Sequence, residues 1–503
     1  MEINTSMTFL PLHYGERLTL VNPLADVGIV TLWSPVRVVR EHLARLGVDL
    51  SPETSRIAVL GTLYGEGLPE LLRNLLYNPQ IRHLVLFGVD LGDARASLTG
   101  FFQRGVEATL CLGSVVHQII GTGHKIDDGV KPEDFAGRLQ LVDLGRPGDE
   151  ESAGRVREFF ATLGAVEPVV PERREVPMPT FEVSRFPSDP RGHQILADTP
   201  LLAWKELIHR LYRFGYRVVL SGKGARLELQ NIKVTIRKPV VESDAALRQH
   251  GFDPEAFRRY QRSILDAQLP PDQHYGYGNR LRGHFGQHEH DTLTRVAALL
   301  RADPDSRHGY IALWDTGRDL LSDASGHPCL VALFVRRFEG ELTLTAQFRT
   351  HNALQAWLMN VHGLLAIQRF IAEESGLGPG ALTIISHSIT IDPQGGGLER
   401  ARSIHDFRNR LWDEGDGFTQ DPHGDFVISV DLELGLIVVE HRFEGQRLHR
   451  YSGASAEAIE KRLARDLALS DIAHALYLGR ELARAEARLK RGRRETSGPG
   501  GTG

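Results

Sequence analysis

The chain has 503 residues, of which 41% are hydrophobic and 24% charged, and its formal net charge is −5. A chain of this length exceeds what one hydrophobic core supports, so we expect about two to four domains. The mild negative charge disfavours a protein that coats nucleic acid, and no apolar run has the length of a membrane span. The two cysteines, Cys111 and Cys329, argue against a disulfide framework and fit a reducing cytoplasm.

Residues 1–165 alternate between strand and helix patterns, which predicts a small parallel sheet with helices on both faces. Strands are expected at residues 27–33, 57–61, 83–88 and 139–144, with helices at 35–47 and 69–78. Glycines at 61, 88–92 and 121–123 are expected at the carboxyl ends of strands, where such domains bind ligands. None of these clusters has the spacing of a dinucleotide or phosphate loop, so we assign no cofactor to them. Cys111 lies in an apolar run and is expected in the core.

A proline-rich, charged stretch at residues 166–182 predicts a linker, and a second domain is expected over residues 183–397. This domain opens with an amphipathic helix at residues 202–214. A glycine-containing loop at 221–224 and strands over 226–238 follow.

Three histidines, His284, His288 and His290, raise the question of a metal site. Their spacing matches no familiar zinc ligand set, and no cysteine lies nearby. We therefore expect a surface cluster and predict no metal.

The segment from Gly326 to Asn360 organises the second domain. Two strands, 330–335 and 342–348, are expected to be joined by a turn at Glu339-Gly340. A long buried helix over residues 353–376 follows, ended by Gly376, and Asn360 is expected about two turns into it. Because a hairpin brings the start of one strand beside the end of its partner, Cys329 is expected to lie next to Arg349.

This pairing points to a reactive cysteine. An adjacent cation favours the thiolate over the thiol, and the thiolate is the nucleophilic form. The alternative is that Cys329 is a small buried residue of a strand, as lone cysteines often are.

A third unit is expected over residues 398–490. Strands at 426–432, 436–443 and 446–451 form a meander, and two helices follow, capped at Ser455 and Ser470. The polar, glycine-rich residues 491–503 are expected to be a disordered tail.

Several motifs of the second domain occur in the order and spacing of one known family. They are Tyr277-Gly278-Asn279-Arg280-Leu281-Arg282, Asp303-Pro304-Asp305-Ser306-Arg307, Pro328-Cys329-Leu330, Gln347-Phe348-Arg349-Thr350, Ala356-Trp357 ahead of Asn360, and Ser386-His387-Ser388. Over residues 185–395 the chain resembles the thymidylate synthase family, closest to its archaeal-type branch. The resemblance predicts an α/β and α+β multidomain protein with a central thymidylate-synthase-like α+β domain between the parallel α/β domain and the meander.

The resemblance implies transfer of a one-carbon unit to C5 of a uracil nucleotide. The donor would be 5,10-methylene-tetrahydrofolate or methylene-tetrahydromethanopterin, as a co-substrate. Cys329 would be the nucleophile that adds to C6, and Arg349 would lower its pKa and contact the substrate phosphate. Asn360 would pair with N3–H and O4 of uracil, and Tyr277 would supply a pocket hydroxyl or simply pack.

The family also implies a homodimer in which Arg307, with His308 beside it, binds the phosphate of the partner's nucleotide. In the family an arginine of the loop that corresponds to residues 221–224 binds the substrate phosphate. Lys223 or Arg226 would take that role here. The resemblance further assigns substrate contacts to Ser388, Thr390 and Asp392, a substrate and pterin contact to Asn352, and a pterin contact to Trp357.

Three departures from the family pattern concern the sugar and pterin pockets. Thr390 and Asp392 stand where the family has a histidine and a tyrosine that hold the sugar 3′-hydroxyl, and Asn352 stands where it has an aspartate. The glutamate that organises the catalytic water in the family has no clear counterpart. Two alternatives therefore stay open: a pyrimidine nucleotide hydroxymethylase, and a catalytically inactive nucleotide-binding or regulatory homologue.

The N-terminal region resembles the corrinoid-carrying subunit of tetrahydromethanopterin S-methyltransferase, through residues 78–82, the strand ending at Gly88, and Ile119-Ile120-Gly121. In that protein the histidine of a Gly-His pair holds the cobalt of the corrinoid. This chain has Gly92-Asp93 there, and a carboxylate is a poor ligand for a soft late transition metal. We therefore predict against corrinoid binding. The C-terminal unit resembles a small uncharacterised domain found beside archaeal-type synthases.

Overall fold

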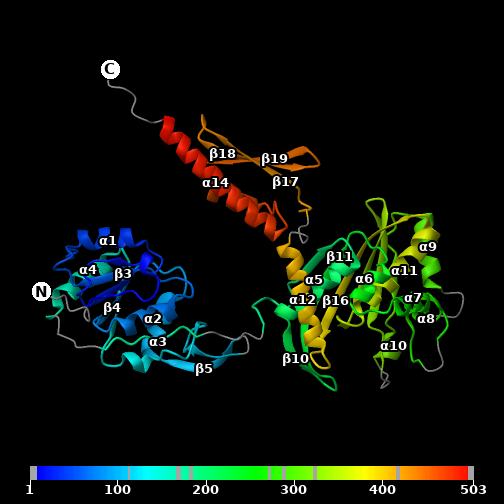
Figure 1. The fold of residues 1–503 in the computed structure, drawn as a ribbon, viewed down its shortest axis with the longest axis horizontal. Helices are drawn as coiled ribbons and strands as arrows, with labels where there is room; N and C mark the ends of the chain where they lie inside the picture. Colours follow the sequence, from blue (N-terminus) through cyan, green and yellow to red (C-terminus); the bar gives the residue numbers. More distant parts are fainter. Residues whose placement is uncertain are drawn as a thin grey trace. The chain divides into compact units, whose positions relative to one another are not determined.

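The structure is a computed structural model, and it describes residues 8–111, 114–165, 172–179, 185–269, 273–285, 291–320, 326–414 and 420–496. The chain divides into two compact units. One comprises Met1–His193 with Arg213–Ile232, and the other comprises Gln194–Tyr212 with Lys233–Gly503. Figure 1 shows the elements of each part.

The N-terminal domain is built on a five-stranded sheet in the order β1-β3-β2-β4-β8, in which β2, β3, β4 and β8 run parallel. Its strands are β1 (Thr19–Leu20), β2 (Val27–Val30), β3 (Ile57–Gly61), β4 (His83–Phe87) and β8 (Gln140–Gly145). Its helices are α1 (Val36–Arg45), α2 (Leu68–Tyr77), α3 (Ala94–Gln103) and α4 (Glu150–Thr162). Apolar residues of α1 and α4 pack on one face of the sheet, and those of α2 and α3 pack on the other. The predicted parallel sheet with two covered faces is confirmed.

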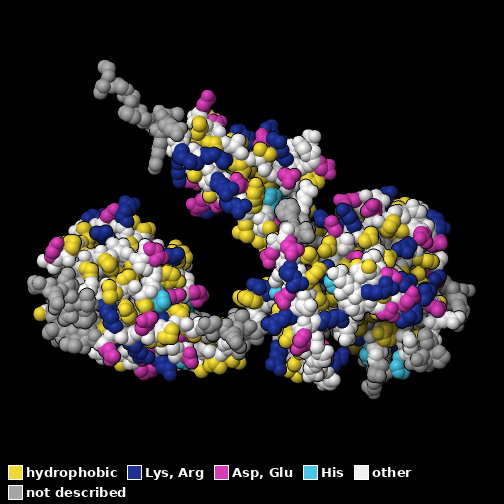
Figure 2. Space-filling view, viewed as in Figure 1, with side chains coloured by type: hydrophobic (Ala, Val, Ile, Leu, Met, Phe, Trp, Pro, Cys, Tyr) yellow, Lys and Arg dark blue, Asp and Glu magenta, His cyan; other side chains and the backbone are white. Residues whose placement is uncertain are grey.

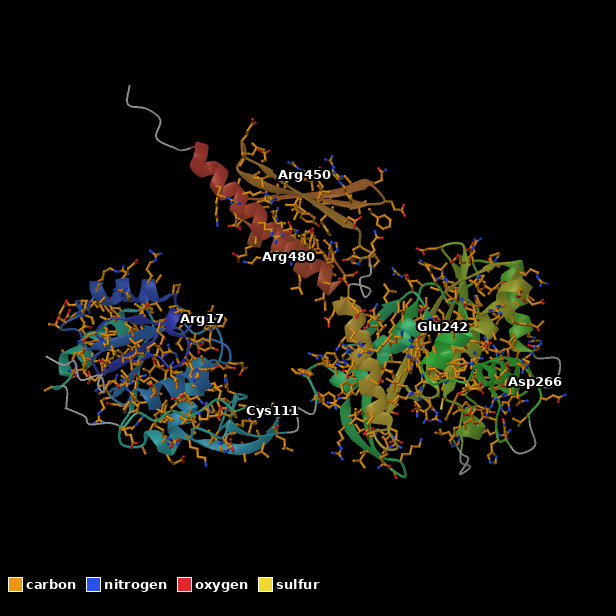
Figure 3. All side chains as sticks on the ribbon, viewed as in Figure 1. Arg17, Cys111, Glu242, Asp266, Arg450 and Arg480 are labelled. Atoms are coloured by element: carbon orange, nitrogen blue, oxygen red, sulfur yellow. The ribbon has the colours of Figure 1, made fainter. Side chains whose placement is uncertain are left out.

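A second, antiparallel sheet in this domain was not expected from the sequence. It consists of β5 (Val106–Cys111), β6 (Ser114–Ile119) and β7 (Lys125–Ile126). Cys111 ends β5 and is half-buried, so its predicted place in the core is wrong (Figure 3). Gly121 follows β6, so the 121–123 cluster does not end a strand of the parallel sheet.

Part of the predicted linker is bound to the N-terminal domain. The Arg73 side chain is fully buried, makes a two-point ion pair with Asp127 at 3.0 and 2.7 Å, and donates to the carbonyl oxygens of Val176 and Pro177. A buried arginine needs such acceptors because an unpaired buried charge is strongly destabilising. The segment around Val176 is therefore held by the domain and is not a free spacer.

The central fold is an eight-stranded sheet with the path β10-β11-β16-β14-β13-β12, to which β9 and β15 are added. Its strands are β9 (Gln194–Ala197), β10 (Tyr216–Leu220), β11 (Gly224–Ile236), β12 (Tyr310–Ala312), β13 (Leu330–Phe338), β14 (Glu341–Phe348), β15 (His351–Asn352) and β16 (Gly378–Ile391). Its helices are α5 (Pro200–Phe214), α6 (Asp244–Gln249), α7 (Pro254–Ser263), α8 (Tyr277–Arg282), α9 (Thr292–Ala302), α10 (Thr316–Asp319), α11 (Trp357–Ser375) and α12 (Gly397–Asp413).

The predicted hairpin is confirmed. Strands β13 and β14 pair antiparallel from Phe338 opposite Glu341 back toward Leu330 opposite Phe348. Glu339 and Gly340 form the turn, with φ values of 53° and 85°. A two-residue turn with both φ angles positive matches the right-handed twist of the strands it joins.

The long helix α11 begins later than predicted. Residues His351 and Asn352 form the short strand β15, which pairs with β16, and α11 starts at Trp357. Asn360 therefore lies in the first turn of the helix and not two turns in. The predicted stop at Gly376 is confirmed, because this residue adopts φ 78° at the helix C-cap.

Helix α12 belongs to the central fold, although residues from 398 onward were assigned to the C-terminal unit. Arg408 forms an ion pair with Glu206 on α5, and Arg400 donates to the carbonyl oxygen of His250. These contacts attach α12 to the preceding helices.

The C-terminal unit contains the predicted meander and two helices. They are β17 (Asp425–Asp431), β18 (Leu436–Phe443), β19 (Gln446–Gly453), α13 (Ala456–Arg465) and α14 (Ile472–Thr496). Ser455 caps α13 as predicted, but the amide of His474 in α14 donates to Asp471, which caps this helix in place of Ser470. The helix continues to Thr496, beyond the expected start of a disordered tail at Arg491. Figure 2 shows Lys and Arg side chains along α14.

No helix in the described part of the chain combines the length and the apolar character needed to cross a membrane.

A buried ion pair beside α8 yields a testable prediction. Arg280 binds both oxygens of Asp319 at 2.9 and 2.6 Å, and the two side chains are only 2% and 5% exposed. Arg280→Met leaves a buried carboxylate without its cation, so we expect a loss of about 3–5 kcal/mol in unfolding free energy. Tryptophan fluorescence during urea unfolding measures this, because four of the five tryptophans (Trp204, Trp314, Trp357 and Trp412) lie in the central fold.

Arg337→Met is the matched control. Its ion pair with Asp305 is solvent-exposed, at 37% and 75%, so the expected loss is about 0–1 kcal/mol. Equal losses in the two variants would contradict a structural role for the buried pair.

Candidate functional site

Cys329 and Arg349 lie side by side at the open end of the β13–β14 hairpin. The Arg349 amide donates to the Cys329 carbonyl oxygen at 2.9 Å. Its guanidinium donates through Nε to Pro328 O at 2.9 Å and through Nη2 to His327 O at 3.0 Å. Arg349 therefore fixes the segment that carries the cysteine, and both side chains stay half-buried rather than sealed in the core.

Three tyrosines surround the cysteine. The Tyr277 hydroxyl accepts hydrogen bonds from the backbone amides of Cys329 and Leu330, each at 3.2 Å. Burial, followed by the charge of a Cys329 thiolate, raises the pKa of Tyr275. Burial, Tyr275 and Cys329 together raise the pKa of Tyr260. The thiol therefore lies within electrostatic reach of phenols that keep their protons.

A pocket of about 490 Å³ opens beside this group. It is lined by Tyr260, Ser263, Ile264, Asp266, Gln268, Gln273, His274, Tyr275, Gly276, Tyr277 and Gly326. Asp266, labelled in Figure 3, is the acidic residue of the lining, and the lining residues that the structure describes include no lysine or arginine. Aromatic walls without a cation suit a flat, uncharged ring better than a phosphate.

Asn360 belongs to a chain of side-chain hydrogen bonds. The Tyr260 hydroxyl donates to its Oδ1 at 2.5 Å, and its Nδ2 lies 2.9 Å from Nε2 of His351. Nδ1 of His351 lies 2.8 Å from the hydroxyl of Ser386. Burial lowers the pKa of His351 to about 3, so its ring is neutral at physiological pH.

The other residues predicted to contact substrate lie on the neighbouring strands. The Ser388 amide donates to the carbonyl oxygen of Arg349 at 3.2 Å, and Thr390 pairs with Asn352. Asp392 lies just beyond the end of β16. The paired strands β15 and β16 therefore bring Ser388 and Thr390 next to the Arg349 segment.

Asn352 has a local role in the structure. Its Oδ1 accepts from the amides of Leu354 and Gln355 at 3.1 and 2.9 Å, which shapes the turn ahead of α11. Trp357 is completely buried, so its indole offers no surface to a pterin in this conformation.

The remaining predicted contacts are distributed elsewhere. Arg307 and His308 are exposed on the loop between α9 and β12. Lys223 lies in the turn between β10 and β11, and Arg226 lies in β11.

The histidine cluster is only partly described. His284 binds Asp315 at 2.8 Å, whereas His288 and His290 lie outside the described residues. Within the described ranges, no group of three or more potential ligands is arranged to hold a metal ion.

Comparison with known proteins assigns the central fold. Residues 197–391 match the family model described as thymidylate synthase. These residues form a thymidylate synthase family domain. A protein of Methanothermobacter thermautotrophicus named "Putative thymidylate synthase" is 29% identical over 200 residues, covering 37% of this chain and 86% of the relative. A protein of the same name from Methanopyrus kandleri is 29% identical over 182 residues, covering 36% and 84%.

The C-terminal unit matches a second family model. Residues 420–496 correspond to the family described as PterinBD-DUF4346. Neither family model covers the N-terminal domain, so its predicted likeness to a methyltransferase component stays a prediction.

Four residues of the thymidylate synthase domain that meet at the site were not expected there from the sequence: Tyr260, Tyr275, His351 and Ser386. Ser386 lies inside a recognised motif and His351 directly follows another, so their positions gave a usable signal. Tyr260 lies 100 residues before its partner Asn360, and no sequence pattern connects them.

The buried His362 of α11 gives a prediction on pH. It is 0% exposed, neither ring nitrogen has a hydrogen-bond partner among the described residues, and burial lowers its pKa from 6.5 to about 4. Because unfolding lets this ring take up a proton, its contribution to stability is complete above pH 6.5 and is lost as pH falls toward 4. From pH 8 to pH 5 the loss is about 2 kcal/mol.

His362→Leu is expected to remove this pH-dependent loss of about 2 kcal/mol in unfolding free energy. At pH 8 its unfolding free energy is expected to equal or exceed that of the wild type. Urea unfolding at pH 8 and pH 5, followed by tryptophan fluorescence, measures both quantities. His308→Leu, at an exposed position, is the control. An undiminished pH dependence in His362→Leu would contradict a neutral buried ring.

Proposed function

We propose that this protein transfers a one-carbon unit from a reduced methylene-pterin to C5 of a uracil nucleotide, with Cys329 as nucleophile. The observation that carries the proposal is that half-buried Cys329 bonds through its backbone to Arg349 and to the hydroxyl of Tyr277, which lines the pocket. The family of the central domain and the names of its archaeal relatives support the same reaction.

Each residue has a defined task in this reaction. The Cys329 thiolate adds to C6 of the pyrimidine, which makes C5 an enolate carbon able to attack the methylene group. Arg349 favours the thiolate and has further N–H donors for the substrate phosphate. Asn360 binds the N3–O4 edge of the base. Loss of the C5 proton and hydride transfer from the same pterin then release a methylated nucleotide and free the thiol.

The pocket of about 490 Å³ suits the pterin. Its tyrosine rings match a flat heterocycle, and Asp266 can accept hydrogen bonds from the amino edge of the ring. The match of residues 420–496 to a family named for pterin binding supports a pterin as the one-carbon carrier. Tetrahydrofolate and tetrahydromethanopterin derivatives share this ring.

Covalent trapping tests the reaction. A fluorine at C5 cannot leave as a proton does, so 5-fluoro-dUMP or 5-fluoro-UMP with methylene-pterin is expected to leave a stable adduct on Cys329, read by mass spectrometry. Cys329→Ser is expected to abolish the adduct, and Cys111→Ser, the other cysteine, is expected to keep it. If neither fluorinated nucleotide forms an adduct, the alternative of a non-catalytic nucleotide-binding protein is favoured. With unmodified nucleotide, the mass of the product distinguishes a methylase from a hydroxymethylase.

We also propose a homodimer formed through the uncovered face of the central sheet. Tyr310, Phe334 and Phe338 are 51%, 44% and 54% exposed on β12 and β13, and the rings of Tyr310 and Phe334 lie 5.2 Å apart. An aromatic patch of this kind on a sheet marks a protein interface.

Phe334→Glu is expected to convert a dimer into a monomer, because burying a carboxylate at the interface is unfavourable. Size-exclusion chromatography with light scattering measures the mass. Phe443→Glu, at a phenylalanine of the C-terminal unit that is 43% exposed, is the control and is expected to leave the mass unchanged. A dimer that survives Phe334→Glu would refute this interface.

A further inference from the structure

A pocket of about 440 Å³ lies at the amino ends of the parallel strands in the N-terminal domain. Its lining residues come from the starts of β2, β3, β4 and β8 and from the segment that follows α4. Backbone hydrogen bonds join these segments: the amides of Arg82 and His83 donate to the carbonyl oxygen of Asp26 at 2.8 and 3.1 Å, and the Gln140 amide donates to that of Arg82 at 2.8 Å. The pocket is therefore built on hydrogen-bonded strands, at the edge opposite to the carboxyl ends where parallel α/β domains usually bind ligands.

The lining is positively charged, although the chain has a net charge of −5. The lining residues that the structure describes include three arginines, Arg56, Arg82 and Arg138, and one carboxylate, Asp26. Asp26 is 5% exposed and accepts from two nitrogens of Arg56 at 2.9 and 2.7 Å, so Arg56 neutralises it. Burial lowers the pKa of His83, so this ring is mainly neutral at pH 7 and adds no charge. Arg82 and Arg138 therefore leave the lining with an excess of two positive charges.

Arg138 is held near other cations. Burial lowers its pKa, and the charges of Arg174 and Arg82 lower it further. Asp134 opposes this shift, but its carboxylate also forms an ion pair with Arg174. Like charges that are held close together repel each other, and an anion bound between them removes that repulsion.

The size and chemistry of the pocket suit a phosphate-bearing small molecule. A Cβ at Gly137 or Gly164 would meet no atom within 4 Å, so both glycines border open space. The volume of about 440 Å³ falls within the range typical of small-molecule sites. The planar fork of a guanidinium matches two oxygens of a phosphate group, and a phosphate monoester carries close to two negative charges at pH 7, the excess that the lining provides.

We propose that the N-terminal domain binds a phosphate-bearing small molecule in this pocket, through Arg82 and Arg138, with Arg56 held beside them by Asp26. The inference goes beyond the function proposed for Cys329 and does not depend on it, because the pocket belongs to the other compact unit of the chain. It gives the N-terminal domain a ligand at the edge of its sheet where the sequence indicated none.

Isothermal titration of the full chain with inorganic pyrophosphate, at low ionic strength, tests the proposal. We expect Arg82→Gln and Arg138→Gln each to weaken the affinity at least about tenfold, since a hydrogen bond to a charged group is worth that factor or more. Arg82→Lys keeps the charge without the planar fork and is expected to lose less affinity than Arg82→Gln. Arg40→Gln, at an exposed position of α1, removes the same charge outside the pocket and is expected to keep the wild-type affinity.

Several results would overturn the proposal. They are a wild-type chain that binds no pyrophosphate, unchanged affinity in both glutamine variants, an equal loss in Arg40→Gln, and equal losses in Arg82→Lys and Arg82→Gln. Pyrophosphate bound by arginines of the central domain would give unchanged affinity in the pocket variants, so it cannot be mistaken for binding in the pocket.

Two further measurements complete the test. Far-UV circular dichroism shows whether each variant folds, and the two glutamine variants lie on different segments, so a local folding defect in one does not explain both. Citrate, a tricarboxylate, is the comparison anion, and tighter binding of citrate than of pyrophosphate would refute the choice of phosphate. The Cys329 adduct is measured separately, so failure of the pocket and failure of the one-carbon transfer are distinguishable.

Discussion

The site depends on the antiparallel pairing of β13 with β14. That pairing sets the start of one strand against the end of the other, so the backbone of Arg349 bonds to Cys329 and its guanidinium fixes the two residues before the cysteine. The same arginine thus holds two consecutive carbonyl oxygens of the segment that leads into Cys329. A lysine, with a single flexible ammonium, has no planar fork of donors to do the same.

A second constraint comes from helix α11, whose first turn approaches the same end of the sheet. Asn360 and Gly363 lie one turn apart on this helix, and the missing side chain at Gly363 admits the Tyr260 ring against it. Helix α11 therefore places the Asn360 amide next to His351 of β15. Tyr260 of α7 packs against the same helix and reaches the same amide. Polar groups inside a protein cost little only when their partners are present, and here each end of the amide has one.

The domains that precede and follow the thymidylate synthase fold have different architectures. The C-terminal unit matches a family named for pterin binding. A pterin is also the one-carbon carrier in the reaction proposed for the central site. The N-terminal domain is built on a largely parallel sheet, in which Gly61 ends β3 and Gly88 directly follows β4. Asp93 is predicted to stand where the corrinoid-carrying subunit has its cobalt-binding histidine. It lies at the N-cap of α3, the helix that follows β4, and parallel α/β domains bind ligands at the carboxyl ends of such strands.

The sequence by itself determined the fold class, the hairpin with its Glu339-Gly340 turn, the helix stop at Gly376 and the meander, because each has a local signature of alternation, turn residues or caps. The tertiary structure alone decided the start of α11, since residues 351–352 are recruited into the sheet by β16. It also placed α12 with the central fold through the Arg408–Glu206 pair, and it showed the antiparallel sheet that carries Cys111. The hydrogen bond between Tyr260 and Asn360 was likewise decided by the tertiary structure. The two residues are 100 positions apart and meet only because α7 packs against α11, which sequence periodicity does not predict.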